Sequence, residues 1–425
     1  MLNRIIADSD DDEVDATPGA PTAPRTPPFE ALWPSQIQVL MDGMQPLMGK
    51  GSQQARVVIC SYDLIQKYRP AMMAQRFRMI ICDESHYLKN PASQRTQAVA
   101  PLLSPDMAKR VLELSGTPAT SHPFQLYAQV HALRPDLFPS AQAFGARYAE
   151  PRLLQGKIQY GGGRNLHELH ALLKREVMIR RMKADVLTQL PAKTRTLIYT
   201  TINDPNLRYI HSSADDTANP SLASASAAAT VPTCPLSRMQ QWQETGVAKV
   251  PFVCSYMDDL LEATRTGKFL LFAHHQAVLH AYKAHLVKRG VGHMYIDGST
   301  PAEERQVYVE RFQADPSCRG EILSITAGGT GLTLTAADTV VFGELMWDPA
   351  LLCQGEDRTH RIGQLSSVQC RYILAQNSVD DYLWPILQRK LELTGRALDG
   401  KKGTLAVSET VRTSSASAAS SSSML

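Results

Sequence analysis

The sequence predicts an α/β protein with two parallel-sheet lobes and helical insertions between them. Three observations predict this fold. Short apolar runs alternate with helical stretches along the chain, which is typical of parallel sheets with crossover helices. Polar motifs directly follow several of these runs, at the sheet edge where α/β proteins bind ligands. The chain has 425 residues and is 44% hydrophobic, so it can form two domains with separate cores.

Composition narrows the class of protein. The formal net charge is only +3, so any DNA-binding surface has to be a local patch. The seven cysteines include no C-x-x-C pair, which argues against a zinc ribbon or a disulfide framework and favours a reducing compartment. No apolar run reaches membrane length, and an acidic run occupies residues 8–15, where a signal peptide would be apolar. We therefore expect a soluble, intracellular protein with no membrane partner.

Residues 1–28 are expected to be a disordered tail. They combine the acidic run with Thr, Pro and Ala, a composition that buries too little apolar surface to order itself. The first lobe is expected over residues 29–205. Its apolar runs of buried-strand type are Val57–Cys60, Met79–Cys82 and Val111–Leu114.

A helical and basic stretch lies within this lobe, between about residues 124 and 190. It forms either a solvated helix face or a DNA-facing surface, and the sequence leaves both alternatives open. The clustered basic residues are Lys174, Arg175, Arg180, Arg181 and Lys183. Residues 206–250 are expected to be a linker or low-complexity insertion, because residues 211–235 are rich in Ser, Ala, Thr and Pro.

The second lobe is expected over residues 251–403. It starts with the apolar strand Lys268–Phe272 and contains another strand at Ile322–Ile325. Residues 404–425 end in a serine run and are expected to be a disordered tail.

The first candidate site is the pair Asp83 and Glu84, which follows the second apolar run of the first lobe. Asp83 can hold Mg²⁺ through water, and Glu84 can orient or deprotonate an attacking water. Such a pair alone is commonplace at a strand end. Ser115, Gly116 and Thr117 close the neighbouring strand with hydroxyls and a tight turn, which suits sensing of a γ-phosphate.

The second candidate site is a glycine-rich loop in the second lobe. The loop follows the strand at Ile322–Ile325 and contains Gly328, Gly329, Thr330 and Gly331. Small residues let backbone amides approach a phosphate closely. The phosphate belongs either to a nucleotide or to a DNA backbone, and the sequence leaves this open.

The third candidate site is the arginine pair Arg358 and Arg361, three residues apart and expected on one helical face beside a glycine turn. Their planar guanidinium groups suit a transferring phosphoryl group, the arginine-finger role. Gln354 lies one helical turn before the first arginine.

Two further sets of residues are weaker candidates. His274 and His275 are conceivable metal ligands, but histidines at a strand end are more often packing residues or phosphate contacts. Trp347 and Trp384 are most simply explained by packing.

In this order, the motifs resemble the SNF2 family of superfamily 2 DNA translocases. Within that family they look like the HARP-type annealing helicases, the SMARCA-like protein 1 group and its sister with a RAN-binding zinc finger. The segments that carry the resemblance are Asp83–Asn90, Leu114–Ala119, Leu187–Lys193, Val340–Pro349 and Asp380–Pro385.

The resemblance implies two RecA-like lobes that bind ATP and Mg²⁺ and hydrolyse ATP on DNA. It implies annealing or remodelling of forked and single-strand-containing DNA at stalled replication forks in the nucleus. Asp83 and Glu84 would serve Mg²⁺ and water, and Arg358 and Arg361 would be arginine fingers. The residues that would sense nucleotide and couple the lobes are His86, Ser115, Gly116, Thr117 and Gln354.

The sequence departs from the family in one essential part. Family members begin the first lobe with a Gly-Lys-Thr phosphate loop, also called Walker A, and an upstream adenine-contacting glutamine, and neither is found. Gly49-Lys50-Gly51 lacks the required flanking residues. We therefore expect the first lobe to be incomplete and the chain as written to hydrolyse ATP poorly or not at all. A missing N-terminal segment explains this better than an evolved loss, because the absent strand would leave Arg110–Leu114 as an exposed apolar edge.

Two rival functions follow. One is a catalytically dead DNA-binding module of the same fold, and a more distant one is an RNA helicase. The family's HARP repeats, its zinc finger and the peptide that binds a single-strand-binding protein are not found in the sequence. The annealing-helicase subgroup stays open.

Overall fold

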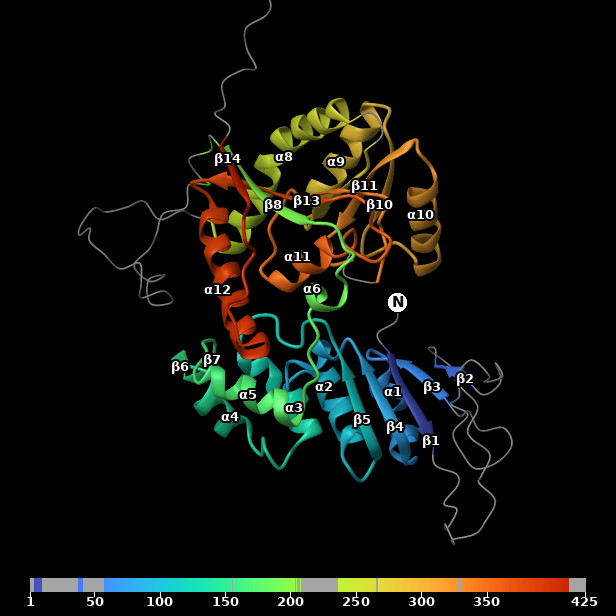
Figure 1. The fold of residues 1–425 in the computed structure, drawn as a ribbon, viewed down its shortest axis with the longest axis vertical. Coiled ribbons are helices and arrows are strands. Elements are labelled where there is room, and N and C mark those ends of the chain that lie inside the picture. The colour runs from blue at the N-terminus through green and yellow to red at the C-terminus, as the bar shows by residue number, and fades with distance from the viewer. Residues whose placement is uncertain are drawn as a thin grey trace, which may run out of the picture. The chain divides into compact units, whose positions relative to one another are not determined.

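The computed structural model describes residues 4–9, 37–40, 57–154, 156–202, 204, 207, 236–264, 267–327 and 331–412. The chain divides into two compact units (Figure 1). Unit 1 comprises Met1–Arg180 and Leu393–Lys402, and unit 2 comprises Arg181–Glu392 and Gly403–Leu425. Both units are built on sheets with helices packed against them, so the predicted α/β class is confirmed.

Unit 1 contains a five-stranded sheet in the order β2-β3-β1-β4-β5. The strands are β1 (Arg4–Ser9), β2 (Ile37–Val39), β3 (Val57–Ser61), β4 (Phe77–Asp83) and β5 (Ala108–Leu114). The pairs β2–β3 and β4–β5 are parallel, and β1 runs antiparallel between β3 and β4. All three apolar runs predicted for this lobe are strands.

Strand β1 differs from the expectation of a disordered N-terminal tail. It lies within residues 1–28, and its sequence Arg4-Ile5-Ile6-Ala7 includes two β-branched residues. Isoleucine suits the pleated, half-buried surface of a sheet. The prediction of disorder rested on the average composition of residues 1–28, which does not reveal a short apolar run. Residues 10–28 lie outside the described residues.

Strand β5 lies at the end of the sheet and exposes apolar side chains, as the sequence predicts for Arg110–Leu114. Among the described residues β5 is paired only on the side of β4. Leu112 is 46% exposed and Leu114 is 44% exposed. An unpaired strand edge with exposed leucines is a surface that favours association with another chain.

Helices cover this sheet and build a separate helical layer beside it (Figure 1). The elements near the sheet are α1 (Ile65–Met73), η3 (Ser85–Leu88), α2 (Gln94–Val99) and η4 (Ala100–Leu103). The helical layer contains η5 (Pro123–Leu126), α3 (Tyr127–Leu133), α4 (Ala141–Tyr148) and α5 (Leu166–Glu176). This layer confirms the expected helical stretch, and it also contains a hairpin, β6 (Pro151–Leu154) and β7 (Lys157–Tyr160).

The helical layer has its own hydrophobic core. Phe138, Phe144, Leu169 and Leu173 are buried there. Ala397 and Leu398 join the same core from the last turn of α12 (Val379–Asp399). Residues from the far end of the sequence therefore complete unit 1.

Unit 2 contains a seven-stranded sheet in the order β10-β11-β9-β12-β13-β8-β14, in which every neighbouring pair is parallel. The strands are β8 (Lys193–Thr201), β9 (Phe269–Ala273), β10 (Gly292–Ile296), β11 (Cys318–Ser324), β12 (Thr339–Phe342), β13 (Val368–Gln376) and β14 (Glu409–Arg412). The helices are α6 (Lys183–Val186), α8 (Arg238–Ala263), α9 (Gln276–Lys288), α10 (Ala302–Ala314), α11 (Pro349–Glu356) and α12.

The central strands of unit 2 are buried on both faces. On β9, Leu270 and Phe272 belong to one core cluster, and Phe269 and Leu271 belong to the other. Helices α8 and α9 supply the second cluster, for example through Met257. Two-sided burial explains why these strands read as continuous apolar runs. No helix among the described residues is long and apolar enough to cross a membrane.

The structure moves three predicted domain boundaries. Strand β8 was expected in the first lobe, residues 29–205, but it pairs with β13 and β14 of the second sheet. Helix α8 begins at Arg238, inside the linker expected over residues 206–250. Leu405 is 2% exposed and β14 extends to Arg412, so the expected tail, residues 404–425, begins with ordered chain.

Candidate active site

The predicted residues of the first lobe meet where β4 and β5 end. Glu84 follows β4 with a left-handed backbone (φ 51°, ψ 47°) and starts the turn into η3. Its Oε2 lies 3.1 Å from Nδ1 of His86, and the same nitrogen lies 3.3 Å from Oγ of Ser115. A left-handed conformation costs a non-glycine residue about 1–2 kcal/mol, and such strain is concentrated at functional sites. Glu84 and Ser115 therefore both approach the same ring nitrogen of His86.

Asp83 is exposed and lies beside this chain. Its Oδ1 accepts the backbone N–H of Glu84 at 3.0 Å, and its carbonyl oxygen accepts the Tyr62 hydroxyl at 2.9 Å. A solvent-facing carboxylate held in this way suits a hard cation reached through water. Within the described ranges, no group of three or more His, Cys, Asp or Glu side chains is arranged to hold a metal ion directly.

The turn after β5 is held by residues that sequence analysis did not assign to the site. The Thr117 amide donates to Oγ of Ser115 at 3.1 Å. Arg180 Nη1 donates to the carbonyl oxygen of Gly116 at 2.9 Å, and its Nε donates to Asp399 at 2.8 Å. For Arg180 these contacts favour an internal structural role over a solvated or DNA-facing one.

Buried polar contacts join the loops that follow β4 and β5. The Ser85 hydroxyl donates to Oε1 of Gln129 at 3.0 Å, and Nε2 of Gln129 donates to the carbonyl of Pro118 at 2.8 Å. Lys89 Nζ donates to Oγ1 of Thr120 at 2.9 Å. Gln129 is 4% exposed, so the bridge lies in a low-dielectric interior, where such hydrogen bonds rigidify the structure.

In unit 2 the arginine pair lies beside the end of the glycine-rich loop. Gly328, Gly329 and Thr330 lie outside the described residues, and Gly331 has a φ of 57°. Arg358 is 3% exposed, with Nη1 lying 3.5 Å from the carbonyl of Leu332. Arg361 is half-buried, and its Nη1 donates to Oγ1 of Thr333 at 3.3 Å. The structure therefore places the two arginines beside Leu332 and Thr333, which directly follow the glycine-rich loop in sequence.

The arginines do not share a helical face, which corrects the expectation. Helix α11 contains Gln354 but ends at Glu356, and the chain continues in tight turns. The amide of Arg358 bonds to the carbonyl of Gly355, and the amide of Arg361 bonds to the carbonyl of Thr359. Gly363 then adopts a φ of 99°, which an L side chain rarely adopts. Turns rather than helical spacing therefore position the two guanidinium groups.

A buried ion network fixes the start of this turn. Glu356 is fully buried and accepts hydrogen bonds from Arg195 at 2.6 and 2.7 Å, Lys193 at 3.0 Å and the Tyr372 hydroxyl at 2.7 Å. Burial alone would raise the pKa of Glu356, but the Arg195 hydrogen bonds and the charge of Lys193 hold the pKa below its ordinary value. Removing one partner of such a pair leaves an uncompensated buried charge, which costs about 3–5 kcal/mol.

The two histidines at the end of β9 contact the ring of Trp242, with centroids 4.8 Å away for His274 and 4.4 Å away for His275. Nδ1 of His275 lies 2.6 Å from Oε1 of Glu344. Oε2 of Glu344 accepts the backbone amides of His274 and His275 at 2.8 and 3.0 Å, where α9 begins. Trp347 lies edge-on to Trp242, and Trp384 is buried against Tyr372, which confirms the packing expected of both tryptophans.

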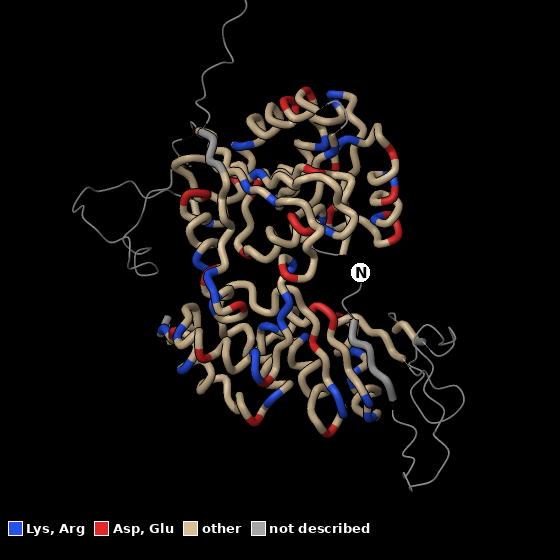
Figure 2. The backbone as a smooth tube through the Cα atoms, viewed as in Figure 1, with Lys and Arg blue, Asp and Glu red and all other residues tan. Residues whose placement is uncertain are grey.

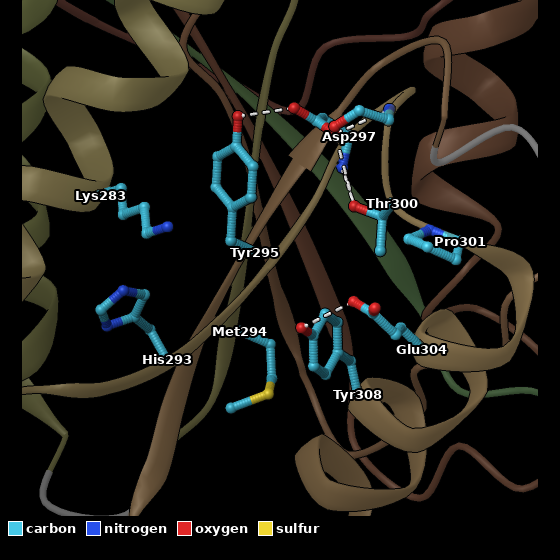
Figure 3. Close-up of a pocket in the computed structure, with 10 residues that line it drawn as sticks. Lys283, His293, Met294, Tyr295, Asp297, Thr300, Pro301, Glu304 and Tyr308 are labelled. Carbon is cyan, nitrogen blue, oxygen red and sulfur yellow. Dashed lines mark hydrogen bonds between the residues drawn. The ribbon is translucent and has the colours of Figure 1, made fainter.

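A polar pocket of about 390 Å³ lies beside strand β10 in unit 2 (Figure 3). Its lining includes Lys283, His293, Tyr295, Asp297, Glu304 and Tyr308, and none of the predicted site residues. Hydrogen bonds from the Ser299 hydroxyl and backbone hold the pKa of Asp297 well below its ordinary value. The signal that sequence analysis missed is Asp297-Gly298-Ser299-Thr300, a polar turn that directly follows an apolar strand.

Two α/β units, one with an acidic pair at a strand end and one with an arginine turn beside a glycine loop, define the class of helicase-like, two-lobed ATPases. A model of the SNF2-related domain matches residues 43–220, and a model of the helicase conserved C-terminal domain matches residues 252–363. The chain therefore belongs to the SNF2 family, and its similarity to HARP-type annealing helicases is confirmed by the relatives below.

Two relatives illustrate the similarity. The SWI/SNF-related matrix-associated actin-dependent regulator of chromatin subfamily A-like protein 1 of Xenopus tropicalis is 41% identical over 86% of this chain and 39% of its own length. The DNA annealing helicase and endonuclease ZRANB3 of Mus musculus is 38% identical over 89% of this chain and 35% of its own length. The chain thus spans less than two fifths of either relative. A solved structure, the C-terminal part of the Fun30 ATPase domain, matches 31% of this chain and 44% of its own at 26% identity, with a TM-score of 0.30.

Proposed function

We propose that this chain forms the motor part of a DNA-dependent ATPase that anneals or remodels forked and single-strand-containing DNA during replication-fork repair in the nucleus. The observation that carries the proposal is that Glu84 and Ser115 approach the same ring nitrogen of His86, where two parallel strands end. This arrangement joins a candidate catalytic carboxylate to a turn able to respond to the nucleotide state. The name of one relative, the DNA annealing helicase and endonuclease ZRANB3, supports DNA annealing as the reaction.

In this proposal each lobe supplies a part of the chemistry. Asp83 would hold Mg²⁺ through water, and Glu84 would orient the water that attacks the γ-phosphate of ATP. His86, Ser115, Gly116, Thr117 and Gln354 transmit the nucleotide state. Arg358 and Arg361 stabilise negative charge on the transferring phosphoryl group, because guanidinium is permanently charged and planar.

The glycine-rich loop from Gly328 to Gly331 contacts a phosphate of nucleotide or DNA. The DNA partner is a fork or a junction between single and double strands. A single-strand-binding protein is a further partner in this proposal. The family's Gly-Lys-Thr phosphate loop is required for hydrolysis, since it holds the β- and γ-phosphates.

A strand-annealing assay tests the proposal. The protein is extended upstream to include the family's Gly-Lys-Thr loop and is incubated with a DNA duplex containing an unpaired bubble. We expect the bubble to close only when ATP is present, and we expect Glu84→Gln to abolish closure. Closure that is equal with and without ATP would contradict the proposal.

The second candidate function is a non-catalytic module that holds fork DNA. The absence of the Gly-Lys-Thr motif from this sequence favours it. It predicts salt-dependent DNA binding without nucleotide, unchanged by Arg361→Ala, because phosphate contacts release counterions. Failure of the chain to bind DNA in about 50 mM salt would exclude it.

A further inference from the structure

The β6–β7 hairpin of unit 1 has no role in the site described above. It extends from the helical layer beside α4 (Figure 1). Its register places Leu153 opposite Ile158 and Pro151 opposite Tyr160. Gly156 has a φ of 75° in the connecting turn, and a positive φ suits a short hairpin loop. Strands β6 and β7 therefore form a paired hairpin at this side of unit 1.

One face of this hairpin is apolar from its base to its outer part. At the base, the Tyr160 ring stacks on Phe124 with centroids 4.3 Å apart and an interplanar angle of 25°. Further out, Leu153 is 73% exposed and Ile158 is 57% exposed. Directly opposed residues of an antiparallel pair share a face. The hairpin thus anchors itself to the core and holds two apolar side chains out in water.

The sequence of the hairpin is basic. Residues 151–160 include Arg152 and Lys157 and no acidic residue. Arg164 follows the hairpin and is exposed. Glu150 precedes it and lies 3.5 Å from Arg152. Figure 2 shows lysine and arginine in blue on the backbone of this region. A net positive projection is complementary to a nucleic-acid backbone.

We propose that the hairpin contacts DNA where a duplex opens into single strands, with Leu153 and Ile158 packed against the last base pair so that they partly unstack it from its neighbour. This inference rests on the proposed function, which makes forked DNA the substrate. Apolar side chains are known to insert at base steps, and bases freed from pairing present apolar faces. Arg152, on the other face, is placed to neutralise phosphates.

The size of the apolar pair favours DNA over a protein partner. A stable protein interface buries about 800 Å² on each partner, which two side chains on a narrow hairpin cannot supply. A base step, in contrast, is filled by one or two side chains. The size of the apolar surface therefore fits the last base pair of a DNA fork better than a protein partner.

The test uses the chain as it is and forked DNA with 2-aminopurine at the last base pair before the junction. Unstacking of this base raises its fluorescence. We expect binding to raise the fluorescence, and we expect about tenfold tighter binding to the fork than to duplex DNA. The double variant Leu153→Ser with Ile158→Ser should lose both effects while keeping duplex affinity within about twofold.

Two controls accompany this test. Val287→Ser with Val307→Ser changes two residues that are 61% and 59% exposed outside the hairpin, and it should retain the fork preference. Ile158→Leu keeps the apolar surface and should also retain it. Thermal melting verifies that each variant is folded.

The outcomes separate this inference from the proposed function. If the hairpin variant keeps the fork preference and the fluorescence rise, the hairpin proposal is wrong while DNA binding stands, and a protein contact becomes the alternative. If the unaltered chain binds no DNA at low salt, both proposals fail.

Discussion

At the residue scale, the site depends on side chains whose neighbours set their position. Glu84 is the clearest case, because a left-handed backbone turns its carboxylate toward His86, 3.1 Å away. The acidic pair was recognisable from its place after an apolar strand. The contact between His86 and Ser115 was not recognisable, because the two residues are 29 positions apart and only strand pairing brings them together.

Replacing Glu84 with Gln tests its role in positioning water. In the upstream-extended protein, we expect DNA-stimulated ATP hydrolysis to fall by about 10²–10⁴, the usual contribution of a general base. DNA affinity should not change. Glu303→Gln, at an exposed position on α10, is the matched control and should retain full activity. Equal rates for Glu84→Gln and the unaltered protein would remove Glu84 from the mechanism.

Replacing Arg361 or Arg358 with alanine in the upstream-extended protein is expected to change its melting temperature to different extents. Arg361 is half-buried, so Arg361→Ala should lower the turnover rate by about 10³ or more with little change in melting temperature. Arg358 is 3% exposed, so Arg358→Ala should also lower the melting temperature. Arg311→Ala, whose side chain is 61% exposed, is the control for a lost surface charge. Normal turnover by Arg361→Ala would contradict the finger assignment.

Glu321 makes the stability of unit 2 depend on pH. It is fully buried on β11, both carboxylate oxygens lack a hydrogen-bond partner, and burial raises its pKa to about 8. Because the folded state holds this proton more tightly than the unfolded state, stability is lost as pH rises from about 4.5 to about 8. The loss is at most about 1.4 kcal/mol per pH unit.

The Glu321→Gln variant should therefore gain stability over the unaltered protein as pH rises through this window, as measured by chemical denaturation at several pH values. Glu303→Gln should show no such trend. A stability difference between Glu321→Gln and the unaltered protein that stays constant from pH 5 to pH 8 would show that folding does not raise the pKa of Glu321.

At the scale of elements, strand β5 is the exposed apolar edge that the sequence predicts. Such an edge favours self-association of the chain. Its leucines are nearly half exposed because no described strand lies beyond it. We expect Leu112→Lys with Leu114→Lys to reduce self-association of the chain, measured by light scattering. The free energy of unfolding should change by only about 0.5 kcal/mol, since both sites face solvent.

The same double substitution gives the opposite result if a further strand packs at this edge. In the upstream-extended protein, we expect a clear loss of stability because lysine would replace buried leucine. Val287→Lys with Val307→Lys is the control in both proteins. Equal effects on the two proteins would argue against an additional strand beside β5.

Helix α8 shows which local signals were missed. Its start is a capping box, in which Ser237 Oγ accepts the Gln240 amide at 3.3 Å and Gln240 Oε1 accepts the Ser237 amide at 2.9 Å. The Ser-x-x-Gln pattern was readable in the sequence. The linker predicted over residues 206–250 rested on the Ser- and Ala-rich stretch before this helix, and it therefore included the first residues of α8.

At the scale of the whole molecule, alternating apolar runs were enough to predict two α/β units. The boundaries were not predictable, because distant pairings decide them. Strand β8 joins the second sheet through β13, although about 170 residues separate the paired strands. Ala397 and Leu398 join the core of the first unit for the same reason. Local patterns identify elements, and tertiary contacts assign them to units.

The central claim is that these units are parts of an ATP-driven motor, and the rate of ATP hydrolysis tests it most directly. The rate is measured with and without forked DNA, for this chain and for a version extended upstream to include the Gly-Lys-Thr loop. We predict little hydrolysis by the chain itself and at least about tenfold stimulation by forked DNA in the extended protein. If neither protein hydrolyses ATP while both bind DNA, the motor account is contradicted and the non-catalytic module replaces it.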